Sequence, residues 1–243
     1  MSVAGRQDEA ARVRAQITAV VEQVFDTVAA VHAAALRSLD AVADGADVGG
    51  GANGRGRSAL DEQLQHLLRR PDQLAVGLGL VLAPRPDRGL PLRLQWWQVD
   101  PDDGRLRVLE PDLKPASLGY YDYTTTDWFD RPRRTERRHV VGPYVDVHGT
   151  GRYLLTLTGP VVVDGEFLGV VGADVPVNRF ETHLLQVLGP LRFPFVLLDD
   201  ERRVVLSTAP RWLVGDLVRA WDELPGAALD VPGIPWRLHL ADR

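Results

Sequence analysis

Apolar residues recur every three or four positions through the first forty residues, and this period predicts one long helix over 7–42. Ile17, Val21, Val24, Val28, Val31 and Ala35 alternate spacings of four and three, the seam spacing of a coiled coil. Further apolar positions beside the seam widen it. Two arrangements follow: the helix of residues 1–44 pairs with a second copy in a homodimer, or it covers one face of its own sheet.

A glycine-rich stretch follows, with six glycines between residues 45 and 57. This composition predicts a flexible linker over 45–58. Gly49, Gly51 and Gly54 have the spacing of a dinucleotide-binding fingerprint. That fingerprint needs a strand before it and a helix start directly after it, whereas a long helix precedes it here. We therefore interpret the stretch as a linker.

Short helical and strand patterns come next. Ser58 has the character of an N-cap, and Pro71 ends the short helix that begins there. Apolar runs then predict strands over 74–83, 92–99 and 106–109. Because side chains alternate along a strand, Trp96 and Trp97 must point to opposite faces of the sheet.

The strongest strand signals lie in the middle of the chain. Residues 153–163 and 167–175 are rich in β-branched residues and are joined by Asp164-Gly165-Glu166, so they predict a tight hairpin. The preceding segment, 120–146, has aromatic and acidic residues with no sustained period. We expect an irregular loop that lies over the hairpin and forms a small-molecule pocket.

The last part of the chain is too short for a second complete domain. Its pattern predicts a helix over 177–188, a hairpin within 193–207, a helix over 212–224 and a final strand within 236–240. We expect 190–243 to be a reduced lobe or an extension of the first sheet.

Three motifs in order, YDYTTTDWF, GPYVD and LLTLTGPVVVDGEFLGVVGADV, resemble the signature of Cache domains, which are PAS-like ligand sensors of bacterial signalling proteins. The resemblance implies an α/β (α+β) fold in which a long N-terminal helix packs on an antiparallel sheet, with a reduced C-terminal lobe. It places the ligand-binding domain at 59–189 and gives the long helix the dimer contacts.

The same resemblance implies a set of ligand-binding residues. Those that match amino-acid-binding Cache domains are Tyr121, Thr126, Trp128, Phe129, Tyr144 and Asp174. Thr126 stands where the family has an arginine that clamps the ligand carboxylate, and one hydroxyl cannot replace that charged fork. The side that receives an amine is retained, because Asp174 can pair with a cation and the aromatic rings can offer cation-π contacts.

Two further acids, Asp122 and Asp146, could add negative charge to the pocket, although Asp146 is equally well explained as a turn residue. Structural roles also fit the other positions. Trp128, Phe129 and Tyr144 could fill the core, and Asp174 could accept hydrogen bonds from loop amides.

Five arginines lie together at 131, 133, 134, 137 and 138. They could supply the missing clamp for an acidic ligand, form a phosphate or nucleic-acid patch, or be a solvated helix face balanced by nearby acids. We favour the solvated face.

Composition limits the remaining functions. The net charge of −5 argues against a nucleic-acid partner, and the absence of cysteine excludes disulfides and thiolate metal sites. No motif of a known catalytic site is present, so we expect neither an enzyme nor a cofactor or metal. We find no apolar run near the roughly 18 residues that cross a bilayer and expect no membrane contact.

The sequence therefore predicts a cytoplasmic sensor that binds an amine or amino-acid-like ligand and signals through a separate effector, such as a transcription regulator. The alternative is a scaffold or adaptor that retains the fold without a ligand, and an enzyme of unrecognised type is a third possibility.

Overall fold

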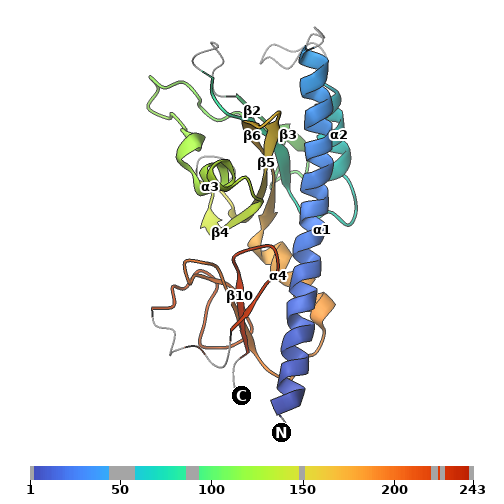
Figure 1. Ribbon diagram of the computed structural model, residues 1–243, viewed down its shortest axis with the longest axis vertical. Helices are drawn as coiled ribbons and strands as arrows, with labels where there is room; N and C mark the ends of the chain where they lie inside the picture. Colours follow the sequence, from blue (N-terminus) through green and yellow to red (C-terminus); the bar gives the residue numbers. More distant parts are fainter. Residues whose placement is uncertain are drawn as a thin grey trace.

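The computed structural model describes residues 3–43, 58–85, 93–147, 151–219, 224 and 228–240. One helix, α1 (Val3–Ala43), runs the length of the molecule, and two antiparallel sheets lie one beyond the other along it (Figure 1). This is the mixed α+β fold with a long N-terminal helix that the sequence predicted. The predicted linker at 45–57 lies outside the described residues.

The first sheet has six strands in the order β3-β2-β1-β6-β5-β4. Their bounds are β1 Gly77–Leu82, β2 Arg93–Val99, β3 Leu106–Val108, β4 His139–Val145, β5 Tyr153–Val163 and β6 Glu166–Pro176. The predicted hairpin is β5 and β6, which pair antiparallel through Asp164 and Gly165, both with positive φ. Since β6 also pairs with β1, it is a central strand.

The apolar stripe of α1 packs on its own chain. Its six predicted seam residues are at most 4% exposed, and the helix contacts α2 (Ala59–Leu68), both central strands and the last strand, β10 (Arg237–Leu240). The structure thus uses this stripe for the internal core, and a second copy cannot reach it without unfolding. Of the two predicted arrangements, the one in which the helix covers its own sheet is therefore correct for this stripe.

Polar contacts fix the N-terminal half of α1 to the C-terminal lobe. The buried carboxylate of Glu9 accepts hydrogen bonds from the backbone N–H groups of Arg192 (2.7 Å) and Phe193 (3.1 Å). Arg12 donates to the carbonyl of Leu188 at 2.8 Å. Because these bonds satisfy backbone groups of the connecting segment, they hold the two sheets on one helix.

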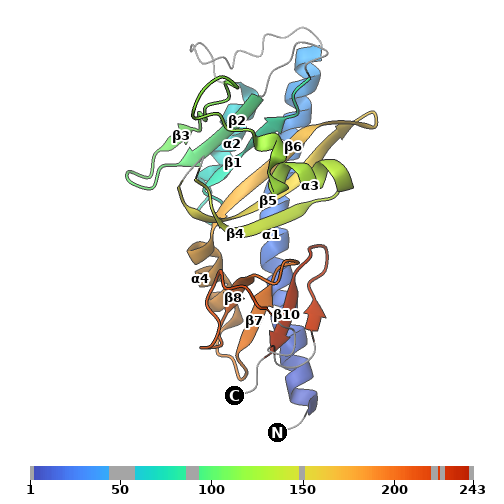
Figure 2. The same cartoon turned by 90° about the vertical axis from the view of Figure 1, so that its left-hand side faces the viewer.

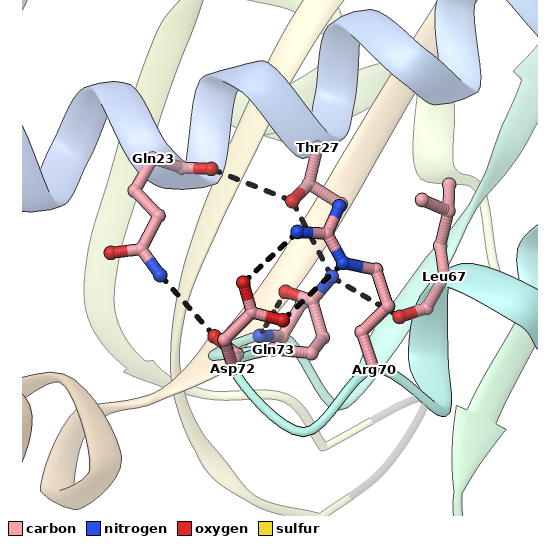
Figure 3. Close-up of polar contacts among 7 residues, drawn as sticks. Gln23, Thr27, Leu67, Arg70, Asp72 and Gln73 are labelled. Atoms are coloured by element: carbon pink, nitrogen blue, oxygen red, sulfur yellow. Dashed lines mark hydrogen bonds and ion pairs between the residues drawn. The ribbon is translucent and has the colours of Figure 1, made fainter.

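The loop between α2 and β1 is tied to the middle of α1 (Figure 3). Gln23 donates to the carbonyl of Asp72 at 3.2 Å, and Gln73 donates to the hydroxyl of Thr27 at 3.4 Å. Arg70 makes an ion pair with Asp72 at 2.9 Å. The loop therefore cannot move without disturbing the helix.

The last strands form a sheet of their own and do not extend the first. Its order is β8-β7-β10-β9, with bounds β7 Phe195–Leu198, β8 Val204–Ser207, β9 Ala228–Asp230 and β10 Arg237–Leu240. The helix α4 (Val177–Leu188) connects β6 to this second sheet. The predicted helix at 212–224 is wrong in its described part, because Gly215 has a φ of 93° and Leu217 bridges to Arg203.

The segment predicted to be an irregular loop is more ordered than expected. It contains a short 3-10 turn, η2 (Tyr123–Thr125), the helix α3 (Asp127–Thr135) and the edge strand β4. The prediction missed β4 because Gly142 and Pro143 interrupt its register with β5. Figure 2 shows α3 on the face of the sheet opposite to α1.

Candidate ligand-binding site

Aromatic side chains fill the space between α3 and the sheet. Tyr123 is fully buried, and its hydroxyl donates to the carbonyl of Leu82 at 2.6 Å and accepts from the backbone N–H of Arg93 at 2.9 Å. Its ring packs against Trp128 and Phe129 with centroid distances of 6.1 and 5.3 Å. This cluster fixes α3 over the open face of the sheet.

Asp174 lies beneath that cluster, on the central strand β6. Its neighbour on β1 is Gly77, where an added Cβ would lie 2.7 Å from the Trp96 indole nitrogen and 3.0 Å from a carboxylate oxygen of Asp174. Gly79 and Gly172 likewise leave room for the Trp96 ring. The three glycines therefore create the space in which the indole and the carboxylate meet.

The Asp174 carboxylate is buried and has a short chain of hydroxyl partners. Thr156 donates to it at 2.7 Å, and the Tyr144 hydroxyl lies 2.8 Å from that of Thr156. The Trp96 indole nitrogen also faces the carboxylate, but the described residues offer it no partner at hydrogen-bonding geometry. One donor bond leaves most of the acceptor capacity of a carboxylate unused.

The protonation of Asp174 is shifted by its surroundings. Burial raises its pKa to about 7, the hydrogen bond from Thr156 opposes that rise, and the charge of Asp146 adds to it. Burial also raises the pKa of Tyr144, and the Asp174 charge contributes. Near neutral pH, Asp174 is thus a group whose charge responds to a cation placed beside it.

Two neighbouring spaces share lining residues, and the carboxylate lines the inner one. An inner cavity of about 30 Å³ is lined by Asp174, Thr156 and several apolar and aromatic side chains. An outer cleft of about 550 Å³ lies between α3, β4 and the β7–β8 turn of the second sheet. Four residues line both spaces: Tyr121, Trp128, Tyr144 and Asp146. The inner cavity has room for only one or two water molecules, whereas the cleft has the size of a small-molecule site.

Five of the eight predicted site residues therefore meet around the inner cavity: Tyr121, Trp128, Tyr144, Asp146 and Asp174. Thr126 lines the outer cleft, and its hydroxyl donates to the Tyr123 carbonyl at 2.7 Å.

Asp122 and Phe129 line neither of these two spaces. Asp122 caps η2, accepting from the backbone N–H of Thr124 at 3.0 Å. Phe129 is 1% exposed and packs within the aromatic cluster, as its alternative role in the core predicted.

The arginine cluster does not supply a clamp to the inner cavity. Arg133 and Arg134 pair with Asp130 on the solvent side of α3, as the solvated-face interpretation expected. Arg138 pairs with Glu22 of α1. Arg131 differs, because it lines the outer cleft and joins α3 to Asp200 and Glu201 of the second sheet.

Two important residues were missing from the predicted site. Trp96 contributes its ring to the inner cavity, and the alternation of side chains had shown only that one of the two tryptophans must face this side. Trp97 takes the other face, where its indole donates to Asp61 at 2.7 Å. Tyr123 anchors α3, and its position inside the YDYTTTDWF motif was the available signal.

The fold is that of the PAS-like Cache sensor domains. Residues 75–182 match the model of the first PDC sensor domain of methyl-accepting chemotaxis protein-like receptors. The match covers less than half of the chain, and it includes both central strands, α3 and Asp174. This part of the chain is thus similar to a PDC sensor domain, and the matched family is a family of sensor domains.

Known proteins resemble the chain in sequence and in fold. Over 92 residues it is 28% identical to methyl-accepting chemotaxis protein TlpQ of Pseudomonas aeruginosa, a match covering 36% of this chain and 13% of TlpQ. The structure of a methyl-accepting chemotaxis protein X aligns over 97% of this chain and 95% of its own, with 14% identity and a TM-score of 0.62. The ligand-binding domain of the Pseudomonas aeruginosa amino acid chemoreceptor PctC, in complex with GABA, aligns over 96% and 95%, with 18% identity and a TM-score of 0.54.

These findings correct the predicted cytoplasmic location. The family and the similar structures are sensor domains of chemoreceptors, which lie outside the cytoplasm. An extracellular ligand binding receptor from Desulfohalobium retbaense has the same fold, with a TM-score of 0.60 and 14% identity over 99% of this chain and 40% of its own.

The composition of α1 also differs from the sequence-based expectation. Its segment Gly5–Leu39 is long and apolar enough to cross a membrane by length and composition, so the prediction that no such run exists is wrong. Half of its most apolar window is buried against the rest of the protein, and a core helix passes the same test.

Proposed function

We propose that this domain senses a small molecule with an ammonium group, which pairs with the carboxylate of Asp174. The observation that carries the proposal is a buried carboxylate with a single hydroxyl donor, enclosed by the rings of Tyr121, Trp128 and Tyr144. A cation beside a carboxylate in this setting gains Coulomb energy, and the ring faces add about 0.5–2 kcal/mol. The inner cavity accepts the ammonium group, and the body of the ligand lies in the outer cleft.

The charge of the outer cleft supports an amine over an acid. Five carboxylates and two arginines line it, the carboxylates being Asp127, Asp146, Asp199, Asp200 and Glu201. Negative excess repels a ligand carboxylate and attracts a cation. An amino acid with its carboxylate directed away from these groups remains within the proposal, whereas a simple acid does not.

A thermal-shift comparison of three four-carbon molecules tests the assignment. GABA carries both charges, butylamine only the ammonium and butyrate only the carboxylate. An amine at about 100 times its dissociation constant stabilises the fold by roughly 2.7 kcal/mol, a shift of several degrees. We expect shifts with butylamine or GABA and none with butyrate. A shift with butyrate alone would contradict the proposal.

The size of the inner cavity favours a second candidate, a scaffold that retains the fold without a ligand. About 30 Å³ is too small for an amino acid unless Trp128 or Tyr121 moves. No shift across a wider panel of amines, amino acids, acids and purines would favour this candidate.

We further propose that the domain acts as a homodimer and passes its ligand state to an effector, for which a transcription regulator is one class. The apolar stripe of α1 is internal, so the contact would use the outward face, whose exposed residues include Ala11, Ala15, Ala19, Ala29 and Ala33 as well as the charged Asp26 and Arg37. Small side chains allow two helices to approach closely. The change Ala19→Arg should then halve the mass measured by light scattering, and an unchanged mass would count against this contact.

The division of the chain also remains a proposal: a ligand-binding lobe at 59–189 and a reduced lobe at 190–243. The separate second sheet supports it.

A further inference from the structure

A second, larger hollow lies on the other side of the first sheet. Among the described residues it is a groove of about 1770 Å³ between the end of α2, the β2–β3 turn, the start of β5 and the first turns of α4. Asp174 does not line it, and it shares no residue with the inner cavity or the outer cleft. The groove therefore has its own set of lining residues, although the charge of Arg152 also acts on Asp174.

Positive charge gathers along this groove although the chain as a whole is acidic. Five arginines line it: Arg69, Arg70, Arg105, Arg152 and Arg179. The lining carboxylates are Asp72, Asp100 and Glu181. Two of the three carboxylates are already paired, Asp72 with Arg70 at 2.9 Å (Figure 3) and Asp100 with Arg107 at 2.6 Å. Arg105 also pairs with Asp103 at 3.8 Å, and the five arginines outnumber the three carboxylates that line the groove.

A buried amide supplies an independent indication of a ligand. Gln65 is 2% exposed and lines the groove, yet its Nε2 has no hydrogen-bond partner among the described residues. The orientation of the amide is fixed, because Arg69 donates to its Oε1 at 3.1 Å and a guanidinium has no acceptor. A buried N–H group without an acceptor is unfavourable, so an acceptor that enters the groove is favoured there.

Two further features increase the positive potential. The N-terminus of α4 borders the groove with no side-chain cap and no acid in its first turn, and this end of a helix attracts anions. Burial, and the neighbouring charge of Arg179, lower the pKa of Arg152. Two guanidinium groups that repel each other are stabilised by an anion between them.

We propose that this groove is a second binding site, for a small organic anion with two or more carboxylate or phosphate groups. The arginines approach from α2, the β2–β3 turn, β5 and α4, so a ligand with several anionic groups can contact more than one element. The unpaired amide of Gln65 and the guanidinium groups supply donors, and the ligand supplies the acceptors.

Titration calorimetry with citrate and with pyrophosphate tests the proposal, since the two probes separate carboxylate from phosphate recognition. At low salt, we expect at least one of them to bind with millimolar affinity or better. Arg179→Gln and Gln65→Leu should each weaken binding about tenfold. Arg105→Gln should also weaken binding. Because the Arg105 side chain is 81% exposed, this variant should fold like the wild type.

Two controls make the result specific. Arg133→Gln removes one arginine from the far side of the sheet, where it pairs with Asp130, and should leave anion affinity unchanged. Tyr144→Phe alters the inner cavity without changing a charge and should also leave it unchanged, so that a failure of the amine proposal is not confused with a failure here. No heat with either probe, equal losses in the controls, or binding of poly-glutamate without binding of small anions would overturn the proposal.

Discussion

At the scale of single residues, the chemistry of the inner cavity depends on one carboxylate. The pKa of Asp174 is about 7 in the fold and 3.8 in an unfolded chain. Between these values the folded state keeps a proton that the unfolded state has released, so stability falls as pH rises through this window. Above pH 7 the carboxylate is charged and buried, and its destabilising effect on the fold is then fully present.

The change Asp174→Asn removes this dependence. From about pH 4 to pH 8 we expect the variant to gain stability relative to the wild type, by roughly a few kcal/mol in total. Melting temperatures recorded across this range measure the difference. Asp230→Asn is the matched control, because that carboxylate is 86% exposed. Parallel pH profiles for wild type and Asp174→Asn would show that the fold does not shift the pKa of the Asp174 carboxyl group.

The space around the carboxylate depends on Gly77. An added methyl group would lie 2.7 Å from the Trp96 nitrogen, so Gly77→Ala forces the indole or the strand to move. We expect a loss of about 1–3 kcal/mol in urea unfolding. Gly159→Ala on β5 is the control, since its methyl group meets only Val28 at 3.7 Å. Equal stability of the two variants would mean that the Trp96 ring is not closely packed.

Sequence reasoning identified the residues of the inner cavity better than their surroundings. The motif positions gave Asp174, Trp128 and Tyr144, because their order along the chain is preserved. Sequence reasoning could not separate Phe129 from Trp128. Adjacent side chains on a helix point in different directions, and these directions can be assigned only once the position of the helix is known. Asp122 was included for its charge, and only the fold shows that it caps a turn.

At the scale of elements, periodicity was a good guide to regular structure and a poor one to irregular structure. The long helix and the β5–β6 hairpin were predicted almost to their ends. β4 was missed because glycine and proline break its pattern, and the helix at 212–224 was overpredicted because local apolar spacing ignores the pairing of Leu217 with Arg203. The sequence could not decide whether α1 packs on its own chain, because the same apolar stripe suits both its own sheet and a second copy of the helix.

The internal packing of α1 predicts how it responds to substitution. Ile17 is fully buried, so Ile17→Ala should destabilise the protein by about 2–5 kcal/mol, and Ile17→Asp by more. Urea unfolding measures both. Ala19→Ser, at an exposed position two residues further along, should change stability by less than about 0.5 kcal/mol. If Ile17→Ala instead lowered only the mass in solution, the stripe would be an intermolecular seam.

At the scale of the whole molecule, two lobes share one helix and meet again at the outer cleft. Arg131 on α3 pairs with Asp200 and Glu201 in the β7–β8 turn, directly beside the proposed ligand body. The side chain of Arg131 is 24% exposed, so the pair contributes at most about 1 kcal/mol to stability. Its importance lies in joining the ligand-binding lobe to the second sheet.

The change Arg131→Gln should loosen this junction while the global fold remains intact. We expect faster amide hydrogen exchange in the β7–β8 turn and an unchanged rate in α2, which lies on the opposite side of the sheet. Arg134→Gln, which removes a charge on the same helix that pairs only locally with Asp130, is the control. Unchanged exchange in the turn would show that the lobes are held together elsewhere.

The most direct test of the amine site is calorimetric titration of butylamine into the wild type and Asp174→Asn at pH 6 and pH 8. Alkyl ammonium groups remain charged at both values, whereas Asp174 ionises between them. We predict that wild-type affinity rises by about tenfold from pH 6 to pH 8, and that the variant does not bind at either pH. Equal affinity in the two proteins would contradict the assignment of Asp174 as the group that receives the ligand.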